Sequence, residues 1–146
     1  MSERKFISPR FGPFEGMRVV GAGSLIAMPF AASMLAEFGA EVIQIERPSA
    51  GDTYRTFGPL ARDEEGAGVG AAWIQEARNR LSMTLELRPD SRDAHEIFLG
   101  LIRESDVFIE NMVWLDKLGI HDDELLRVNP ALVIVHISGF GHGEFG

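Results

Sequence analysis

The sequence contains no cysteine, fewer basic than acidic residues, and no long apolar run. Without cysteine the chain has no disulfide, no thiolate metal site and no cysteine nucleophile, which fits a reducing cytoplasm. Its 14 basic and 22 acidic residues give a net charge of -8, which argues against a broad nucleic-acid-binding surface. No segment reaches the ~20 apolar residues of a membrane span, and the start lacks a signal-peptide core. We therefore expect a cytoplasmic protein that binds neither nucleic acid nor membrane.

What is present is an alternation of strand-like and helix-like segments, typical of an α/β protein. Hydrophobic residues make up 45% of the 146 residues, enough for one domain with its own core. Residues 1–16 are punctuated by proline and glycine, and we expect them to form an irregular arm. Residues 17–146 are expected to form a Rossmann-like, open, mostly parallel sheet with flanking helices.

The expected elements follow one another along the chain. A strand at 17–20 precedes a helix that has Pro29 in its first turn and Gly39 just past its end. Four large apolar side chains of this helix fall on one face at helical spacing: Phe30, Met34, Leu35 and Phe38. Further strands are expected at 41–45, 82–87, 106–110 and 131–138, and further helices at 89–103 and 122–128.

Some of these segments carry more specific expectations. The alternation in 82–87 predicts an edge or half-exposed strand, whereas the β-branched run "ALVIVHIS" at 131–138 predicts a central parallel strand. His136 in that run is expected to be a hydrogen-bonded core histidine. Residues 49–72 are expected to be a long loop with one short helix that covers a site. The glycine-rich "GFGHGEFG" follows the last strand, where open parallel sheets bind ligands.

The stretch "VVGAGSLIAMPF" begins like a dinucleotide-binding unit. That motif needs a third glycine three residues after Gly23, and the position holds Ile26. Glu46 lies about where a ribose-binding acid belongs, but a basic residue and a proline follow it directly. No Gly-Lys-Ser/Thr follows Gly23, so the turn is not a P-loop either. These residues argue against a nicotinamide or flavin site.

Six motifs occur in order: "FGPFEGMRVV", "IAMPFAASMLAEFGAEVIQIERP", "GD", "ARNRLSMTLEL", "DVFIEN" and "NPALVIVHISGFG". Together they span nearly the whole chain, and they resemble the N-terminal segment of the family III CoA-transferases, which include carnitine and formyl-CoA transferases. The motifs "FGPFEGMRVV" and "HISGFG" are most similar to those of the carnitine-type branch. The sequence departs from the family pattern at Met28, where glycine is usual, and at Gly21, where many members carry aspartate.

The resemblance implies acyl-CoA:carboxylate CoA transfer, with CoA and acyl-CoA as substrates and neither a covalently bound cofactor nor a metal. In the family an aspartate attacks the thioester and gives a mixed anhydride, which becomes an aspartyl-CoA thioester that the acceptor carboxylate resolves. That aspartate lies some tens of residues beyond "SGFG", so we expect no catalytic residue within 1–146. Residues 17–146 would then be the N-terminal part of a CoA-binding large domain that continues past Gly146. The full-length protein is expected to be an interlocked homodimer.

The resemblance also implies that Arg47 contacts the adenosine end of CoA. CoA carries a 3′-phosphate and a pyrophosphate there, which suit a planar guanidinium at the carboxyl end of a strand. The alternative is a surface arginine that pairs with Glu46 or Asp52.

Other CoA contacts are implied on both sides of the sheet, each with a structural alternative. Ile26 and Ala27 would line the CoA channel, or simply pack their helix. Arg78 and Arg80 flank the start of a strand, and they would contact the ligand or be surface charges.

The remaining implied contacts lie in the second half of the chain. Asn111 and Met112 follow a buried strand and would border the pantetheine arm. Lys117 would replace an arginine of the family's CoA site, or that arginine is lost in this short segment. Ser138 and Gly139 belong to the glycine-rich loop, whose N–H groups can stabilise developing oxyanions.

Two other functions stay open from the sequence. One is an acyl-CoA racemase or epimerase of the same superfamily, whose histidine and aspartate would also lie past Gly146. The other is a non-catalytic CoA-binding module, which would be favoured if 146 residues were the complete product.

Overall fold

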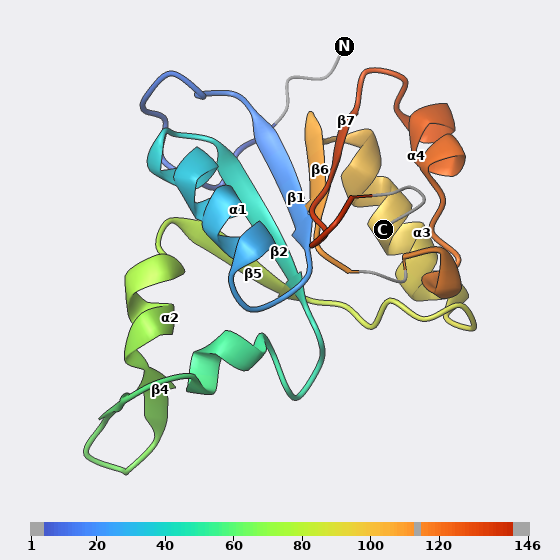
Figure 1. Cartoon of the computed structure of the whole chain (residues 1–146). Coiled ribbons are helices and arrows are strands. Elements are labelled where there is room, and N and C mark those ends of the chain that lie inside the picture. Colours follow the sequence, from blue (N-terminus) through green and yellow to red (C-terminus); the bar gives the residue numbers. More distant parts are fainter. Residues whose placement is uncertain (1–4, 113–114, 142–146) are drawn as a thin grey trace.

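The computed structural model describes residues 5–112 and 115–141, which form a parallel five-stranded sheet with helices on both faces (Figure 1). The strand order is β5-β2-β1-β6-β7, and all four pairings are parallel. The strands of this sheet are β1 (Arg18–Ala22), β2 (Glu41–Glu46), β5 (Arg80–Thr84), β6 (Val107–Glu110) and β7 (Val133–His136). The helices are α1 (Ala27–Glu37), α2 (Ala71–Glu76), α3 (Arg92–Arg103) and α4 (Asp122–Val128). The sequence prediction of an α/β fold with an open parallel sheet is therefore confirmed.

The core consists of two layers, one on each face of the sheet. On the α3 and α4 face, Phe98 packs edge-on against Phe108 of β6, with ring centroids 5.4 Å apart. On the α1 face, Met28 and two alanines of α1 pack against β1 and β2. β1 lies at the centre with neighbours on both sides, and four of its five residues are buried. A parallel strand covered on both faces needs such an apolar sequence.

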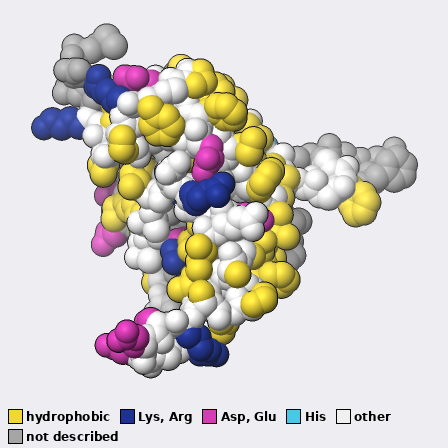
Figure 2. Space-filling view, turned by 90° about the vertical axis from the view of Figure 1, so that its left-hand side faces the viewer, with side chains coloured by type: hydrophobic (Ala, Val, Ile, Leu, Met, Phe, Trp, Pro, Cys, Tyr) yellow, Lys and Arg dark blue, Asp and Glu magenta, His cyan; other side chains and the backbone are white. Residues whose placement is uncertain are grey.

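α1 packs on the sheet through Met28 and small residues, and it leaves other large apolar side chains exposed. A Cβ added to Gly21 of β1 would lie 2.9 Å from the Met28 sulfur, so the close approach depends on that glycine. Phe30, Met34 and Phe38 are 50%, 45% and 48% exposed, and Figure 2 shows hydrophobic side chains gathered on one face of the molecule. The helical spacing of these residues thus marks a solvent-facing apolar stripe in the described part of the chain.

Within the described residues, the strand predicted at 131–138 is present but lies at an edge of the sheet rather than at its centre. β7 pairs with β6 alone in the described part of the chain, and Val133 is exposed. The prediction was wrong because a β-branched run reports packing on the two faces of a strand. It carries no information about hydrogen-bonded neighbours at its two edges. By contrast, the prediction of an edge strand near 82–87 is confirmed, since β5 is the opposite edge of the sheet.

The predicted loop at 49–72 contains more structure than expected. It holds a 3₁₀ turn, η1 (Thr53–Thr56), an antiparallel hairpin of β3 (Leu60–Arg62) and β4 (Gly68–Gly70), and the start of α2. A second 3₁₀ turn, η2 (Leu115–Leu118), precedes α4. Within the described residues, no helix is both long and apolar enough to cross a membrane.

Candidate functional site

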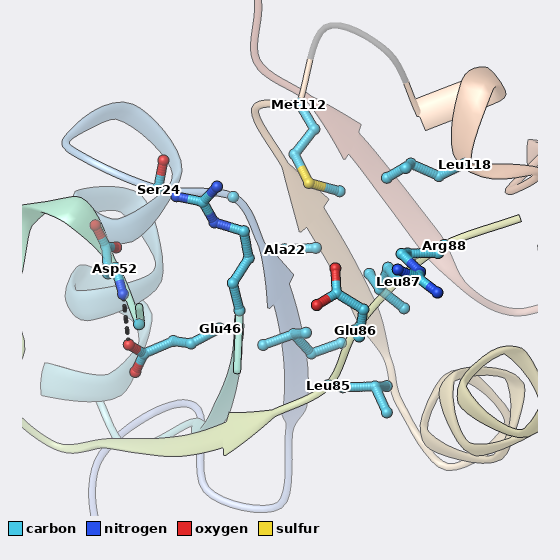
Figure 3. A pocket seen from close by; sticks show the side chains of 14 residues that line it. Ala22, Ser24, Glu46, Asp52, Leu85, Glu86, Leu87, Arg88, Met112 and Leu118 are labelled. Carbon is cyan, nitrogen blue, oxygen red and sulfur yellow. Dashed lines mark hydrogen bonds between the residues drawn. The ribbon is translucent and has the colours of Figure 1, made fainter. Parts of the chain in front are cut away.

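The carboxyl ends of β1, β2, β5 and β6 surround a cavity of about 300 Å³ (Figure 3). Its floor is apolar, because Ala22, Ile45, Leu85, Leu87, Met112 and Leu118 are among its lining residues. We call it the nucleotide-side cavity, and it is lined by Ala22, Gly23, Ser24, Ile45, Glu46, Arg47, Gly51, Asp52, Leu85, Glu86, Leu87, Arg88, Met112 and Leu118. In open α/β sheets this edge is where ligands bind.

The glycine turn after β1 serves a protein side chain. Gly21 lies inside β1, and only Gly23 lies in the turn, with φ +144°. A Cβ at Gly23 would sit 1.8 Å from Oδ1 of Asn111. That amide oxygen accepts a hydrogen bond from Ser24 N at 3.1 Å, and the amide nitrogen donates to Ser24 O at 3.0 Å. The absence of a side chain at Gly23 therefore admits Asn111.

Glu46 is buried at the end of β2 and is fully engaged by the protein. Its carboxylate accepts hydrogen bonds from Arg55 at 2.7 Å, Ser82 Oγ at 2.6 Å and Asp52 N at 2.7 Å. Burial alone would raise its pKa, but Arg55, Ser82 and the Asp52 amide together lower the pKa of Glu46 to about 2. Glu46 is therefore ionised and held in place by hydrogen bonds within the protein. Because its carboxylate oxygens accept from neighbouring residues, they are not left to accept from a ribose hydroxyl.

Two arginines bring positive charge to this cavity. Arg47 is exposed, and within the described residues its side chain has no hydrogen bond or ion pair. The pairing of Arg47 with Glu46 or Asp52, which the sequence left open, does not occur. Arg88 lies across the cavity after β5, and it pairs with the exposed Asp90 at 3.2 Å.

Arg88 was missed by the sequence reasoning. A signal for it existed, because it follows the predicted strand 82–87 much as Arg47 follows β2. Arginines that follow the carboxyl ends of two neighbouring parallel strands lie at the same edge of the sheet.

A second, acidic cavity of about 620 Å³ opens at the ends of β6 and β7. It is lined by Glu110, Met112, Leu115, Asp116, His121, Asp122, Asp123 and His136. His136 bridges two carboxylates, with Nδ1 2.6 Å from Glu110 and Nε2 3.0 Å from Asp122. Burial lowers the pKa of His136, but the two carboxylates outweigh it and raise the pKa above its usual value.

His136 is hydrogen-bonded as predicted, because both ring nitrogens lie within hydrogen-bonding distance of a carboxylate. The prediction that it belongs to the core was wrong, because its side chain is 24% exposed and lines the acidic cavity. Among the described residues, no group of three histidine, aspartate or glutamate side chains is arranged to hold a metal ion.

The structure brings only part of the predicted site together. Arg47 and Met112 line the nucleotide-side cavity, and Asn111 stands beside it with its side-chain amide bonded to Ser24. Lys117 lies in η2, next to the lining residue Leu118, and is exposed.

Four of the other predicted residues do not line it. Ile26 and Ala27 are exposed at the start of α1. Arg78 is exposed and pairs with Glu37 at 3.0 Å. Arg80 stands at the amino end of β5, half-buried, where it donates to Pro29 O and Gln44 Oε1.

The predicted loop after β7 is only partly described. Ser138 and Gly139 are exposed, and Ser138 Oγ accepts a hydrogen bond from Gly141 N at 2.7 Å. Residues 142–146 of the glycine-rich segment lie outside the described residues.

The model of the family described as CoA-transferase family III matches residues 14–145. The chain is 40% identical over 131 residues to the succinyl-CoA–L-malate CoA-transferase alpha subunit of Chloroflexus aurantiacus, covering 88% of this chain and 29% of that protein. It is 37% identical over 135 residues to the bile acid CoA-transferase BaiK of Clostridium scindens, covering 91% of this chain and 28% of that protein. The chain thus spans less than a third of the length of these two relatives.

The fold also matches solved structures. A CaiB/BaiF family protein from Brucella suis superposes with a TM-score of 0.81 at 34% identity, covering 90% of this chain and 35% of that one. The topology described above is therefore shared with a member of that group.

Proposed function

The chain belongs to CoA-transferase family III, and from that premise we propose that the full-length protein moves CoA between carboxylic acids. We propose that the nucleotide-side cavity holds the phosphate-bearing adenosine end of CoA. Residues 17–146 would then be the N-terminal part of the CoA-binding large domain. The named relatives act on succinyl-CoA with L-malate and on bile acids, which makes a carboxylic acid acceptor the shared substrate class.

The observation that carries this proposal is the pair of arginines over an apolar floor. Adenine is a flat, largely apolar ring, and Ile45, Leu85 and Met112 provide an apolar wall for it. The phosphates of CoA need cationic donors at the rim, and Arg47 and Arg88 provide two planar guanidinium groups there. The same rim suits NAD less well, because Glu46 is bonded to its own neighbours and Asn111 occupies the glycine turn.

We propose the reaction route that the family resemblance implies. An aspartate carboxylate attacks the thioester carbonyl and expels the CoA thiolate, which leaves a mixed anhydride. The thiolate then attacks the aspartyl carbonyl and releases the donor acid. The acceptor carboxylate attacks the aspartyl-CoA thioester and expels the thiolate again, and the thiolate takes the acyl group from the new anhydride. Each step exchanges one leaving group at one carbonyl, which divides a difficult exchange into easier ones.

Most carboxylates beside the cavity are held by the protein, which supports a nucleophile that lies outside residues 1–146. Glu46 is bonded to Arg55, Asp52 to two backbone amides, and Glu110 to His136. Glu86 lines the cavity and is exposed, but it is a glutamate where the family resemblance implies an aspartate. A nucleophile needs a free carboxylate held at near-attack distance from the thioester, a placement that contributes ~7–11 kcal/mol.

The test is a transfer assay on the full-length protein. It would be incubated with succinyl-CoA and a panel of carboxylic acids, and new acyl-CoA products would be measured by mass spectrometry. Borohydride would trap the aspartyl-CoA intermediate, and residues 1–146 alone should give neither product nor adduct. Exchange of the acyl α-hydrogen with deuterium, without any transfer, would instead identify a racemase and overturn the proposal.

We propose in addition that the full-length protein is a homodimer. The exposed apolar stripe of α1 supports an arrangement in which more chain, from the same or a second copy, covers this face (Figure 2). Light scattering that reports a stable monomer would contradict it.

A further inference from the structure

Asp52 is a buried carboxylate that joins three parts of the nucleotide-side cavity. Its Oδ1 accepts hydrogen bonds from Leu25 N at 3.0 Å and from Tyr54 N at 2.8 Å. Its Oδ2 accepts one from Gln44 Nε2 at 2.8 Å, and the residue is only 2% exposed. We propose that Asp52 is a positioning residue that fixes the β1–α1 loop at the rim of this cavity.

The loop needs such a fixing point because Leu25 has a strained backbone. Its φ is +67°, in the left-handed region that leucine rarely adopts. Such a conformation persists only where surrounding bonds hold it. Asp52 holds the Leu25 amide, and Asn111 holds the Ser24 backbone one residue earlier. Ser24 lines the cavity, so these bonds set the shape of its rim.

A series of hydrogen bonds that begins at Arg80 and passes through Gln44 orients Asp52. Arg80 donates to Gln44 Oε1 and, at 3.2 Å, to Pro29 O. A guanidinium has no acceptor, so the amide oxygen of Gln44 must face Arg80 and its NH₂ must face Asp52. Arg80 therefore acts on the rim through Gln44 and Asp52, and its contribution does not depend on touching a ligand.

The consequence concerns ligand binding, and it rests on the proposed function. If the rim is held by Asp52, losing its bonds loosens the site for the adenosine end of CoA and leaves the reacting groups in place. The Michaelis constant for acyl-CoA should rise, while kcat at saturating acyl-CoA should stay the same. A purely structural role would lower stability without separating these two constants.

The donor and acceptor pattern gives a direct test by exchange of the two side chains. Asp52→Asn places an NH₂ where Gln44 already presents one, and Gln44→Glu places two carboxylates together. In the double variant Gln44→Glu/Asp52→Asn, the new amide can donate to the new carboxylate, which also accepts from Arg80. The total charge and the number of hydrogen bonds are then restored.

The experiment measures CoA affinity by calorimetry and amide hydrogen exchange of the loop in the full-length protein. Each single variant should weaken CoA binding about tenfold, as one lost hydrogen bond of this kind implies, and speed exchange around Leu25. The double variant should return both to within about threefold of the wild type, by the same reasoning on a restored bond. Asp63→Asn is the matched control, because Asp63 also accepts two backbone amides but lies in the exposed β3–β4 turn.

Single variants that bind CoA and exchange like the wild type would overturn the proposal, and so would a double variant that recovers nothing. If Asp52→Asn does not fold, Gln44→Glu and the double variant give the same comparison. If the wild-type protein does not bind CoA, the proposed function is wrong. The hydrogen-exchange data would still decide whether Asp52 positions the loop.

Discussion

The two cavities at the carboxyl edge of the sheet are neighbours that differ in their charged side chains. Both are bordered by Met112, and both contain carboxylates. The first also has two arginines, Arg47 and Arg88, whereas the basic side chains that line the second are histidines. The first has an apolar floor, and the second contains a histidine held between two carboxylates. Volume alone would not select the first cavity as the CoA site, because the acidic cavity is larger, at about 620 Å³ against about 300 Å³.

The difference shows that charge and floor, rather than volume, assign the anionic ligand. Four acidic side chains would repel the phosphates of CoA from the second cavity. In the first cavity Glu46 is paired with Arg55, and Asp52 accepts three hydrogen bonds from the protein, which leaves Glu86 against the exposed Arg47 and Arg88. The two guanidinium groups therefore favour the phosphates there.

The largest expected effect comes from removing the charge that separates the two cavities. We expect Arg47→Ala/Arg88→Ala to weaken CoA binding by about 10²- to 10⁴-fold, since each lost charged hydrogen bond costs roughly 1.5–3 kcal/mol. Titration calorimetry on the full-length protein measures this. Arg92→Ala on α3, which removes an exposed arginine paired with Glu96, should leave affinity unchanged. Equal affinity in the double variant and the wild type would show that the cavities are not distinguished by these arginines.

The next largest effect concerns the stability of the glycine turn beside the first cavity. Gly23→Ala should destabilise the protein by at least the roughly 1–3 kcal/mol of a strained backbone, because its Cβ also displaces Asn111. Gly58→Ala is the control, since Gly58 also has a positive φ but open space around it. Denaturant unfolding of both variants gives the comparison, and equal losses would mean that the Asn111 contact is unimportant.

A third prediction concerns Glu46, the buried carboxylate of the first cavity. The pKa of Glu46 is about 2 in the fold, below its ordinary value of 4.5, so its stabilising contribution is complete above pH 4.5. It is lost as the pH falls from 4.5 towards 2, and at order of magnitude it amounts to about 3 kcal/mol. The stability difference between the wild type and Glu46→Gln should therefore shrink across this range. Denaturant unfolding at a series of pH values measures it, and a constant difference would contradict the assignment.

The smallest expected effect concerns His136 in the acidic cavity, where the stabilising contribution is lost as the pH rises rather than as it falls. The raised pKa of His136 means that its stabilising contribution is complete below the unfolded value of about 6.5 and is lost as the pH rises through the folded value. His136→Gln should thus destabilise the protein more at pH 5.5 than at pH 9, with CoA affinity unaffected. A pH-independent difference in thermal unfolding would show that the histidine does not bridge the carboxylates as a cation.

These regions also show how far the sequence led. The parallel sheet, α1, α4 and the edge position of β5 follow from periodicity and punctuation, which are local signals. The edge position of β7 and the β3–β4 hairpin depend on pairing between segments, which periodicity does not encode.

The candidate site was predictable only in part, for a related reason. Arg47 could be placed at a strand end from the sequence, and Arg88 could have been. The position of Asn111 inside the glycine turn, and of Arg80 behind Gln44, required segments far apart in the chain to meet. Such polar networks are fixed by tertiary structure and leave little trace in spacing.

The central claim is that the nucleotide-side cavity takes the phosphate-bearing end of CoA, and comparing CoA with dephospho-CoA tests it most directly. Both ligands, and NAD as a contrast, would be titrated into the full-length wild type and Arg47→Ala/Arg88→Ala. We predict that the wild type binds CoA at least about tenfold more tightly than dephospho-CoA, as one charged hydrogen bond requires, and that it binds NAD more weakly still. The preference for CoA over dephospho-CoA should disappear in the double variant. A preference that survives in the double variant, or tighter binding of NAD than of CoA, would contradict the assignment of this cavity.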